Sequence, residues 1–113
     1  MEVNDYVRTE INGIDIHIQL ISKIKEMCDG DLIFTTNGYW GKEQIKKSSP
    51  NIIDLIEVGD YVNGYKVLNV LDFNDNSKMI SLEKIYDNKI AEEDIKSIVT
   101  KEQFESMEYK VKE

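Results

Sequence analysis

Two stretches of the chain decide the fold: MEVNDYVRT at residues 1–9 and IEVGDYVNG at residues 56–64. They share the pattern Glu-Val-x-Asp-Tyr-Val at an offset of 55 residues. A second pair follows in the same order, because GKEQIKKSSP at residues 41–50 matches AEEDIKSIVT at residues 91–100. Matched landmarks in a constant order are typical of an internal repeat. The sequence therefore predicts two tandem units of similar architecture.

Local signals favour strands in both units. Dipeptides that readily adopt the positive φ angles of tight hairpin turns occur four times, at Asn12-Gly13, Asp29-Gly30, Asn37-Gly38 and Asn63-Gly64. Between these turns, residues 14–20 alternate apolar and polar side chains, which predicts a strand with one face in a core and His17 and Gln19 in water. Residues 65–73 and 79–86 alternate more loosely and predict two further strands.

One segment also fits a helix. Apolar side chains between residues 20 and 28 recur at helical spacing, at Leu20, Ile21, Ile24, Met27 and Cys28. Isoleucine is β-branched and lowers helix propensity, so the helix stays an alternative to a strand over these residues.

Each unit ends with signals for a short helical turn. Ser49 and Pro50 precede NIIDLI at residues 51–56, and Thr100 with Gln103 forms a capping-box pattern over KEQFESM at residues 101–107. Short extended segments are expected after these turns, at residues 57–58 and 108–111.

The order of these elements predicts a mostly β chain of two tandem SH3-like small barrels with short helical turns. Residues 1–56 would form the N-terminal barrel-like unit, and residues 57–113 the C-terminal unit with its short helix near residues 100–107. Barrel closure would protect strand edges from pairing with other chains. The alternative is a single β-rich α+β domain, in which convergent turn and strand sequences lie in one mixed sheet.

Charge and composition restrict the function. The chain has 22 acidic and 14 basic side chains and a formal net charge of −8. Such a chain repels phosphate backbones, so we expect no direct nucleic-acid binding and a partner with a basic surface. A signal peptide and an apolar run of 18 residues are both missing from the sequence, which predicts a cytoplasmic protein without a membrane partner.

Catalytic and cofactor-binding patterns are scarce. His17 is the only histidine, and the only cysteine, Cys28, lies beside Asp29 and Asp31, whose negative charges disfavour a nucleophilic thiolate. Glycines fit turn roles and form no phosphate-binding loop. We therefore expect neither an enzyme nor a cofactor.

One partial metal motif lies at residues 72–83. Asp72, Asn74, Asn76 and Glu83 occupy positions 1, 3, 5 and 12 of a calcium-binding loop. Position 6 is Ser77, where the loop needs glycine, and the flanking residues favour strands over helices. A polar hairpin tip is the simpler interpretation, with no metal site.

Two features are candidate partner-binding sites. Tyr39 and Trp40 follow a hairpin turn, and the tryptophan is either a core residue or an exposed anchor of the kind enriched at interface hot spots. Glu92, Glu93 and Asp94 form an acidic run that is either a solvated turn or a patch complementary to a basic groove.

Two segments carry a family resemblance. SPNIIDLIEVGDYVNGYKV at residues 49–67 and IKSIVTKEQFESMEYKV at residues 95–111 resemble segments of small proteins of clostridial and fusobacterial phages and other mobile elements. They cover about a third of the chain and include no known catalytic or binding motif, so no functional residues transfer. In size and charge the chain is similar to the inhibitors that phages deploy against bacterial immunity, including anti-CRISPR proteins.

Two classes of function follow. The first is a protein-binding inhibitor from a phage or mobile element, which acts in the host cytoplasm and blocks a host defence nucleoprotein complex through an acidic surface. The second is an SH3-like adaptor or nucleic-acid-associated module of a phage. It would bind peptide or RNA through exposed aromatic side chains, for which the candidates are Tyr6, Trp40, Tyr61 and Tyr65.

Overall fold

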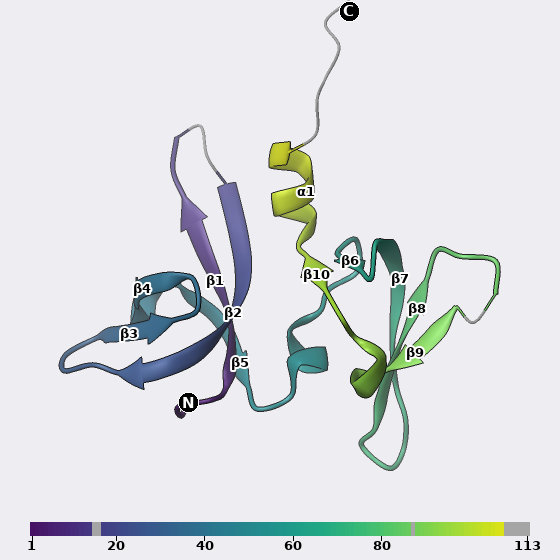
Figure 1. The fold of residues 1–113 in the computed structure, drawn as a ribbon, viewed down its shortest axis with the longest axis horizontal. Helices are drawn as coiled ribbons and strands as arrows, with labels where there is room; N and C mark the ends of the chain where they lie inside the picture. Colours follow the sequence, from purple (N-terminus) through teal and green to yellow (C-terminus); the bar gives the residue numbers. More distant parts are fainter. Residues whose placement is uncertain (15–16, 87, 108–113) are drawn as a thin grey trace, which may run out of the picture.

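The computed structural model describes residues 1–14, 17–86 and 88–107, which form two antiparallel five-stranded sheets (Figure 1). The N-terminal sheet contains β1 (Tyr6–Asn12), β2 (His17–Met27), β3 (Leu32–Thr35), β4 (Gly38–Gly41) and β5 (Ile45–Ser49). The C-terminal sheet contains β6 (Tyr61–Val62), β7 (Tyr65–Asp72), β8 (Lys78–Leu82), β9 (Lys89–Ala91) and β10 (Ile98–Val99). The helical elements are the 3₁₀ helices η1 (Lys42–Gln44), η2 (Ile52–Leu55) and η3 (Glu92–Asp94) and the α-helix α1 (Lys101–Met107).

The two sheets have the same strand order. The N-terminal sheet is ordered β4-β3-β2-β1-β5, and the C-terminal sheet is ordered β9-β8-β7-β6-β10. A 3₁₀ helix precedes the fifth strand of each sheet, and a second helical element follows that strand. The prediction of a mostly β chain is confirmed. The strands form two separate sheets, and not the one mixed sheet of the alternative. Neither sheet closes on itself among the described strands, and the predicted unit bounds at residues 1–56 and 57–113 stay a prediction.

The repeated Glu-Val-x-Asp turn has the same hydrogen bonds in both copies. The glutamate amide donates to the aspartate carboxylate at 2.9 and 2.8 Å, and the aspartate carbonyl accepts from the amide of a core residue at 2.8 and 2.7 Å. The residue before the aspartate has a positive φ, 77° in the first copy and 97° in the second. Equivalent residues are Glu2 and Glu57, Asn4 and Gly59, Asp5 and Asp60, Ile24 and Val67.

The turn signals coincide with the hairpins. Asn63 and Gly64 have φ angles of 52° and 86° and join β6 to β7, and Gly30 and Gly38 also have positive φ. β2 pairs with β1 over its first seven residues and with β3 near its end. The strand prediction for residues 14–20 is confirmed from His17 onward; Ile14 is an exposed part of the turn, and residues 15–16 lie outside the described residues. The strand predicted over residues 65–73 is β7, and the one predicted over residues 79–86 ends at Leu82, so that residues 83–86 are a loop and not a strand. The alternative helix over residues 20–28 is wrong, because the backbone of β2 pairs here with β1 and then with β3.

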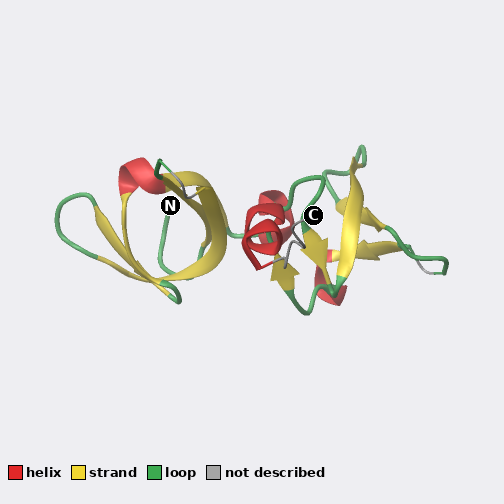
Figure 2. Cartoon of the chain, turned by 90° about the horizontal axis from the view of Figure 1, so that it is seen from above, coloured by secondary structure: helices red, strands yellow, loops and turns green. Residues whose placement is uncertain are grey.

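Each sheet encloses its own apolar core. Val7, Ile24, Ile33 and Trp40 form the N-terminal core. The C-terminal core contains residues of both the sheet and the preceding helix η2: Ile53, Ile56, Val62, Val67, Ile80, Leu82 and Ile90. Seen from above, the strands of each unit curve round their core (Figure 2).

The helical turns fall close to their predicted positions. Thr100 and Gln103 form the predicted capping box, with N–H to side-chain oxygen distances of 3.0 and 3.1 Å. The 3₁₀ helix η2 begins at Ile52, two residues after Pro50. Residues 57–58 lead into a turn and form no strand, and residues 108–111 lie outside the described residues.

Candidate protein-interaction surfaces

A buried arginine joins the two sheets. Arg8 lies on β1, and its side chain is completely buried. Its guanidinium donates to both carboxylate oxygens of Asp60, at 2.6 and 3.1 Å, and to the carbonyl of Leu55 at 3.0 Å. It also donates to Glu102 on α1 at 3.2 Å. A forked, charge-assisted contact of this kind fixes orientation as well as distance, so β1 is held in one position against the C-terminal unit.

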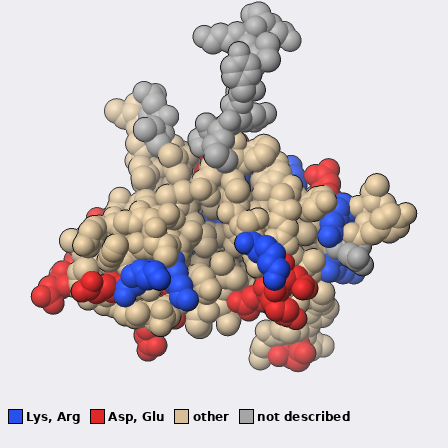
Figure 3. Space-filling view, viewed as in Figure 1, with Lys and Arg blue, Asp and Glu red and all other residues tan. Residues whose placement is uncertain are grey.

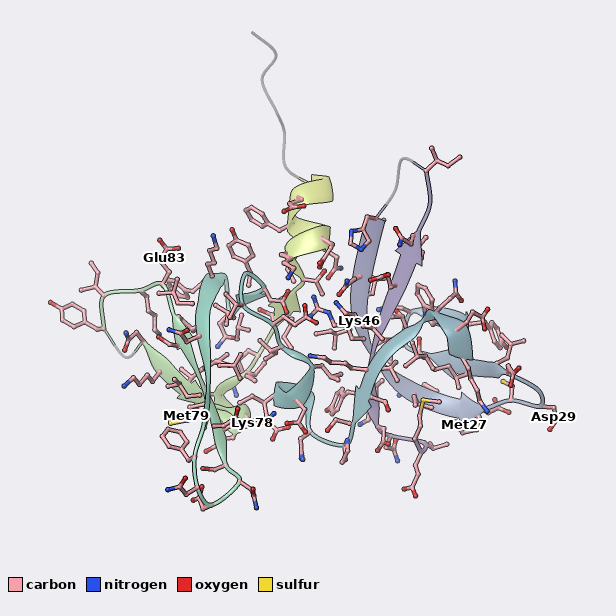
Figure 4. All side chains as sticks on the ribbon, turned by 180° about the vertical axis from the view of Figure 1, so that it is seen from behind. Met27, Asp29, Lys46, Lys78, Met79 and Glu83 are labelled. Atoms are coloured by element: carbon pink, nitrogen blue, oxygen red, sulfur yellow. The ribbon has the colours of Figure 1, made fainter. Side chains whose placement is uncertain are left out.

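Polar contacts extend this junction. Gln19 on β2 accepts a hydrogen bond from Arg8 Nε through its side chain, and its carbonyl accepts one from Thr100 Oγ1, both at 2.5 Å. The carboxylate of Glu57 lies 3.5 Å from Arg8 Nε. Three lysines surround Glu57 at 3.4 to 3.7 Å: Lys46, Lys47 and Lys101. Figure 4 shows Lys46 in the middle of the molecule, between the two sheets.

The junction shifts the pKa values of two of its members away from neutrality. Burial lowers the pKa of Arg8, but the hydrogen bond and charge of Asp60, together with the charges of Glu57 and Glu102, outweigh burial, so the pKa is raised. Burial raises the pKa of Glu57, but the positive charges of Arg8, Lys46 and Lys47 outweigh it and hold that pKa below its ordinary value. Both groups therefore carry their charges at neutral pH.

The burial of Arg8 and Gln19 at this junction is not predicted from the sequence. Gln19 was expected in water, yet only 2% of its surface is exposed, because the C-terminal unit covers the outer face of β1 and β2. Alternation within a strand cannot show what a segment 80 residues away will cover. One signal was present: Arg8 is the only arginine beside 13 lysines, and arginine is preferred for buried, bidentate ion pairs.

Tyr39 lies on the outer face of the N-terminal sheet. Its ring stacks on Phe34 of the neighbouring strand, with centroids 4.8 Å apart and planes inclined by 17°. Tyr39 is 67% exposed, and Leu32 on the same strand as Phe34 is 44% exposed. Glu26 pairs with Phe34 in the ladder and lies beside it. We call these four residues the Tyr39 surface: Glu26, Leu32, Phe34 and Tyr39.

Further acidic residues lie at the edge of the Tyr39 surface. Asp29 and Asp31 are exposed in the turn that joins β2 to β3, and Figure 4 shows Asp29 at the tip of this turn. Lys42 Nζ lies 3.9 Å from the Asp31 carboxylate, and an exposed ion pair at this distance contributes little free energy. The aromatic pair therefore has an acidic border.

Trp40 points to the opposite face of β4. It is 6% exposed and packs in the N-terminal core with Val7, Ile24 and Ile33. The interpretation of Trp40 as an exposed anchor is thereby corrected, because adjacent residues of a strand point to opposite faces. Of the two predicted aromatic residues, only Tyr39 is exposed.

The predicted acidic run forms the 3₁₀ helix η3. Glu93 and Asp94 are exposed, and Glu92 is half-buried. Asn63 fixes the segment, since its side-chain amide donates to the Asp94 carbonyl at 2.9 Å and its side-chain oxygen accepts from the amide of Lys96 at 2.7 Å. The acidic run is thus a rigid turn at the surface.

A cleft of about 420 Å³ lies beside this acidic run. Its lining includes Glu92, Glu93, Asp54 and Lys78, and Lys78 Nζ lies 2.9 Å from the Asp54 carboxylate. The hydrogen bond from Ser49 and the contact with Lys78 hold the pKa of Asp54 below its ordinary value. Asp54 in turn raises the pKa of Lys78. The lining therefore carries three carboxylates and one ammonium.

The structure does not bring the two predicted sites together. Tyr39 lies on β4, and Glu92, Glu93 and Asp94 lie beside β9, on the other side of the junction (Figure 1). Acidic and basic side chains form small neighbouring clusters on the face shown in Figure 3, with no continuous acidic surface. A partner that contacts both sites would have to span both sheets.

The aromatic residues of the alternative function differ in access. Trp40 is buried, Tyr6 and Tyr61 are half-buried, and Tyr65 is 44% exposed. Tyr61 stacks on Phe104 of α1 with ring centroids 4.1 Å apart. Tyr65 is therefore the best placed of the four to meet a ligand.

The segment at residues 72–83 contains a hairpin, as predicted. β7 and β8 flank the tip, where the Asp75 carboxylate accepts hydrogen bonds from the amide and hydroxyl of Ser77. Asp72 lies 3.7 Å from Lys78. In the described part of the chain, no group of three or more His, Cys, Asp or Glu side chains is placed to hold a metal ion.

Comparisons of the chain with protein-family models, curated proteins and solved structures gave no match. Within residues 1–14, 17–86 and 88–107, no helix is long and apolar enough to cross a membrane.

Proposed function

We propose that the chain is a protein-binding inhibitor of a phage or mobile element. It docks on a host protein whose surface is basic because that protein handles nucleic acid in a defence complex. The Tyr39 surface supports this proposal most. An exposed tyrosine ring stacked on a half-buried phenylalanine is a rigid anchor with little entropy to lose on binding, and tyrosine is enriched among interface hot spots.

Charge selects the partner. The net charge of −8, the acidic border of the Tyr39 surface and the exposed residues Glu93 and Asp94 all favour a basic partner over an acidic one. Complementary charge accelerates association, and a few buried aromatic contacts supply most of the lasting affinity. Nucleic acid and this inhibitor would then compete for the same basic surface of the host protein.

The proposed scaffold is a pair of SH3-like barrels. This assignment is supported by the strand order common to both sheets, by the 3₁₀ helix before each fifth strand and by the curvature of each unit round its core. The cytoplasm of the host cell is the proposed location, and no cofactor or catalytic activity is part of the proposal.

The test starts with capture of a partner and ends with displacement of its nucleic acid. The full chain is used as bait in a nuclease-treated lysate of a host that carries its own defence systems. The isolated partner is then loaded with a labelled oligonucleotide and titrated with the chain. Release of the oligonucleotide at the concentration that saturates the partner is expected. Formation of a ternary complex, with the oligonucleotide still bound, contradicts the inhibitor.

Variants assign the two sites. Tyr39→Ala is expected to speed dissociation from the isolated partner, because it removes the aromatic anchor. Reversal of Glu92, Glu93 and Asp94 to lysine is expected to slow association and to weaken its salt dependence. Phe73→Ala, which removes an exposed aromatic side chain of the C-terminal unit, is the control and should leave both rates unchanged.

A further inference from the structure

One hairpin differs in length between the two units. In the N-terminal unit, Thr35 pairs with Gly38, so two residues connect β3 to β4. The equivalent connection between β8 and β9 spans residues 83–88. Ile85 and Tyr86 in this loop are 89% and 82% exposed. The repeat shows that the fold does not need these side chains, so their exposure indicates a binding role.

Neighbouring residues extend the exposed loop into a surface. Tyr65 on β7 lines a shallow cavity of about 510 Å³ together with Glu83, Lys84, Ile85 and Tyr86. Lys84 Nζ lies 5.2 Å from the centre of the Tyr65 ring. Figure 4 shows Glu83 at the start of the loop, which extends away from the sheet. Two tyrosine rings, a lysine and the Glu83 carboxylate therefore meet at one opening.

Two more lysines lie at the base of the loop. The Glu83 amide donates to the Lys66 carbonyl at 2.8 Å, and Lys89 pairs with Ser81 where β9 begins. Both lysine side chains are exposed. We call these six residues the loop surface: Tyr65, Lys66, Lys84, Ile85, Tyr86 and Lys89.

Around this opening the described side chains carry more positive than negative charge: three lysines, Lys66, Lys84 and Lys89, stand against one carboxylate, Glu83, which lines the same cavity. Asp87 of the same loop lies outside the described residues. Five other lysines form ion pairs with carboxylates: Lys42, Lys46, Lys47, Lys78 and Lys101. Among the described residues, no carboxylate forms an ion pair with Lys66, Lys84 or Lys89. Figure 3 shows basic side chains near the outer end of the C-terminal sheet. A local positive charge thus accompanies the two exposed tyrosines.

We propose that the loop surface binds single-stranded nucleic acid. Exposed aromatic rings offer stacking faces to unpaired bases, and lysines beside them bind the phosphates. A duplex hides its base faces and would use only the lysines. The net charge of −8 argues against nucleic-acid binding by the chain as a whole, but phosphates interact mainly with charges within about 10 Å at ordinary ionic strength.

This proposal does not rest on the inhibitor function. The loop surface belongs to the C-terminal sheet, and the Tyr39 surface belongs to the N-terminal sheet. Direct binding to an oligonucleotide is measured without a host protein, and the displacement experiment is repeated with a chain that carries Lys84→Glu and Tyr86→Ala, so each proposal can fail while the other stands.

Fluorescence anisotropy of the full chain with labelled 20-nucleotide DNA and RNA strands, at low and moderate salt, tests the proposal. We expect binding that weakens with salt and that prefers a single strand to the matching duplex. Tyr86→Ala should weaken binding about five-fold or more, because it removes a stacking face. Lys84→Glu should weaken binding and flatten its salt dependence.

Two controls match these variants in chemistry. Tyr39→Ala removes an exposed tyrosine and Lys25→Glu reverses an exposed lysine, both on the N-terminal sheet, and neither should change binding. Absence of binding at low salt, equal affinity for single strand and duplex, or equal losses in the loop-surface variants and the controls would each overturn the proposal. Far-UV circular dichroism of every variant confirms that it is folded.

Discussion

At the scale of single residues, Arg8 shows how a charged side chain comes to be buried. Removing a guanidinium from water costs several kcal/mol, and a buried ion pair recovers this only with good geometry and complete hydrogen bonding. Here Asp60, Glu102, Gln19 and the carbonyl of Leu55 supply acceptors around the guanidinium. The acceptors come from both sheets and from α1, so the arginine is satisfied only when the whole chain is assembled.

Tyr39 and Trp40 give the first prediction, because they are neighbours on opposite faces of β4. Trp40→Ala should lower the free energy of unfolding by about 3–5 kcal/mol, since it leaves a cavity in the N-terminal core. Tyr39→Ala should lower it by less than about 1 kcal/mol, because its ring is mostly in water. Urea denaturation of both variants measures the difference. Equal losses would contradict the assigned faces.

Stability should fall in acid. The pKa values of Glu57 and Asp54 are lowered from ordinary values of 4.5 and 3.8, so the unfolded chain takes up these protons at higher pH than the folded one. The resulting stabilisation is present above the ordinary values and is lost as pH falls through the lower, folded values. Unfolding free energies between pH 7 and pH 2 measure this loss.

Substitution of Ser49 tests the contribution of Asp54 to this pH dependence. Its hydroxyl donates to the Asp54 carboxylate at 2.6 Å, the largest cause of the lowered pKa. Ser49→Ala and Asp54→Asn should each reduce the stability lost between pH 5 and pH 2. An unchanged loss in both variants would show that Asp54 does not contribute to it.

At the scale of elements, the repeated turn at the start of each unit is the best conserved feature between the two copies. The turn requires a positive φ at one residue, which is Asn4 in the first copy and Gly59 in the second. Asparagine and glycine tolerate such angles, whereas β-branched residues are strained there. A Cβ at Gly59 would also lie 3.3 Å from the Lys101 side chain.

The repeat supplies a matched test of this turn. Gly59→Asn introduces the residue that the first copy uses, and Gly59→Val introduces a β-branched residue of similar size. The valine variant should lose about 1–3 kcal/mol of unfolding free energy, and the asparagine variant clearly less. Thermal unfolding ranks the two. A larger loss for asparagine would mean that the copies do not adopt equivalent turns.

The sequence predicted elements that depend on local chemistry. The Asn-Gly and Asp-Gly turns, the strand from His17 and the Thr100 capping box each follow from a few adjacent residues. The helix alternative over residues 20–28 was wrong because pairing with two neighbouring strands overrides a short apolar spacing. Local patterns of this kind do not report which strands will lie beside them.

The candidate sites were predicted in part for the same reason. Tyr39 and the acidic run are set by a hairpin and a turn, and both lie at the surface. Arg8 and the loop surface depend on contacts between segments far apart in the chain. Arg8 meets Glu102 across 94 residues, a separation that no periodicity within one strand can show.

At the scale of the whole molecule, the contacts of Arg8 join the two similar units. Trp40 is the only tryptophan and reports on the N-terminal core, while Ile80 lies in the C-terminal core. If the junction couples the units, both cores must unfold together. Separate units would unfold in two steps.

The most direct measurement is therefore urea unfolding of the wild type and of Arg8→Met. Trp40 fluorescence monitors the N-terminal core, and the backbone NMR signal of Ile80 monitors the C-terminal core. In the wild type the two transitions should coincide. Arg8→Met leaves Asp60 and Glu102 buried without their cation, so it should cost about 3–5 kcal/mol and separate the transitions. Lys25→Met, which replaces an exposed lysine near the end of β2, should leave them coincident. Separate transitions in the wild type, or coincident transitions in Arg8→Met, would show that Arg8 does not couple the unfolding of the two units.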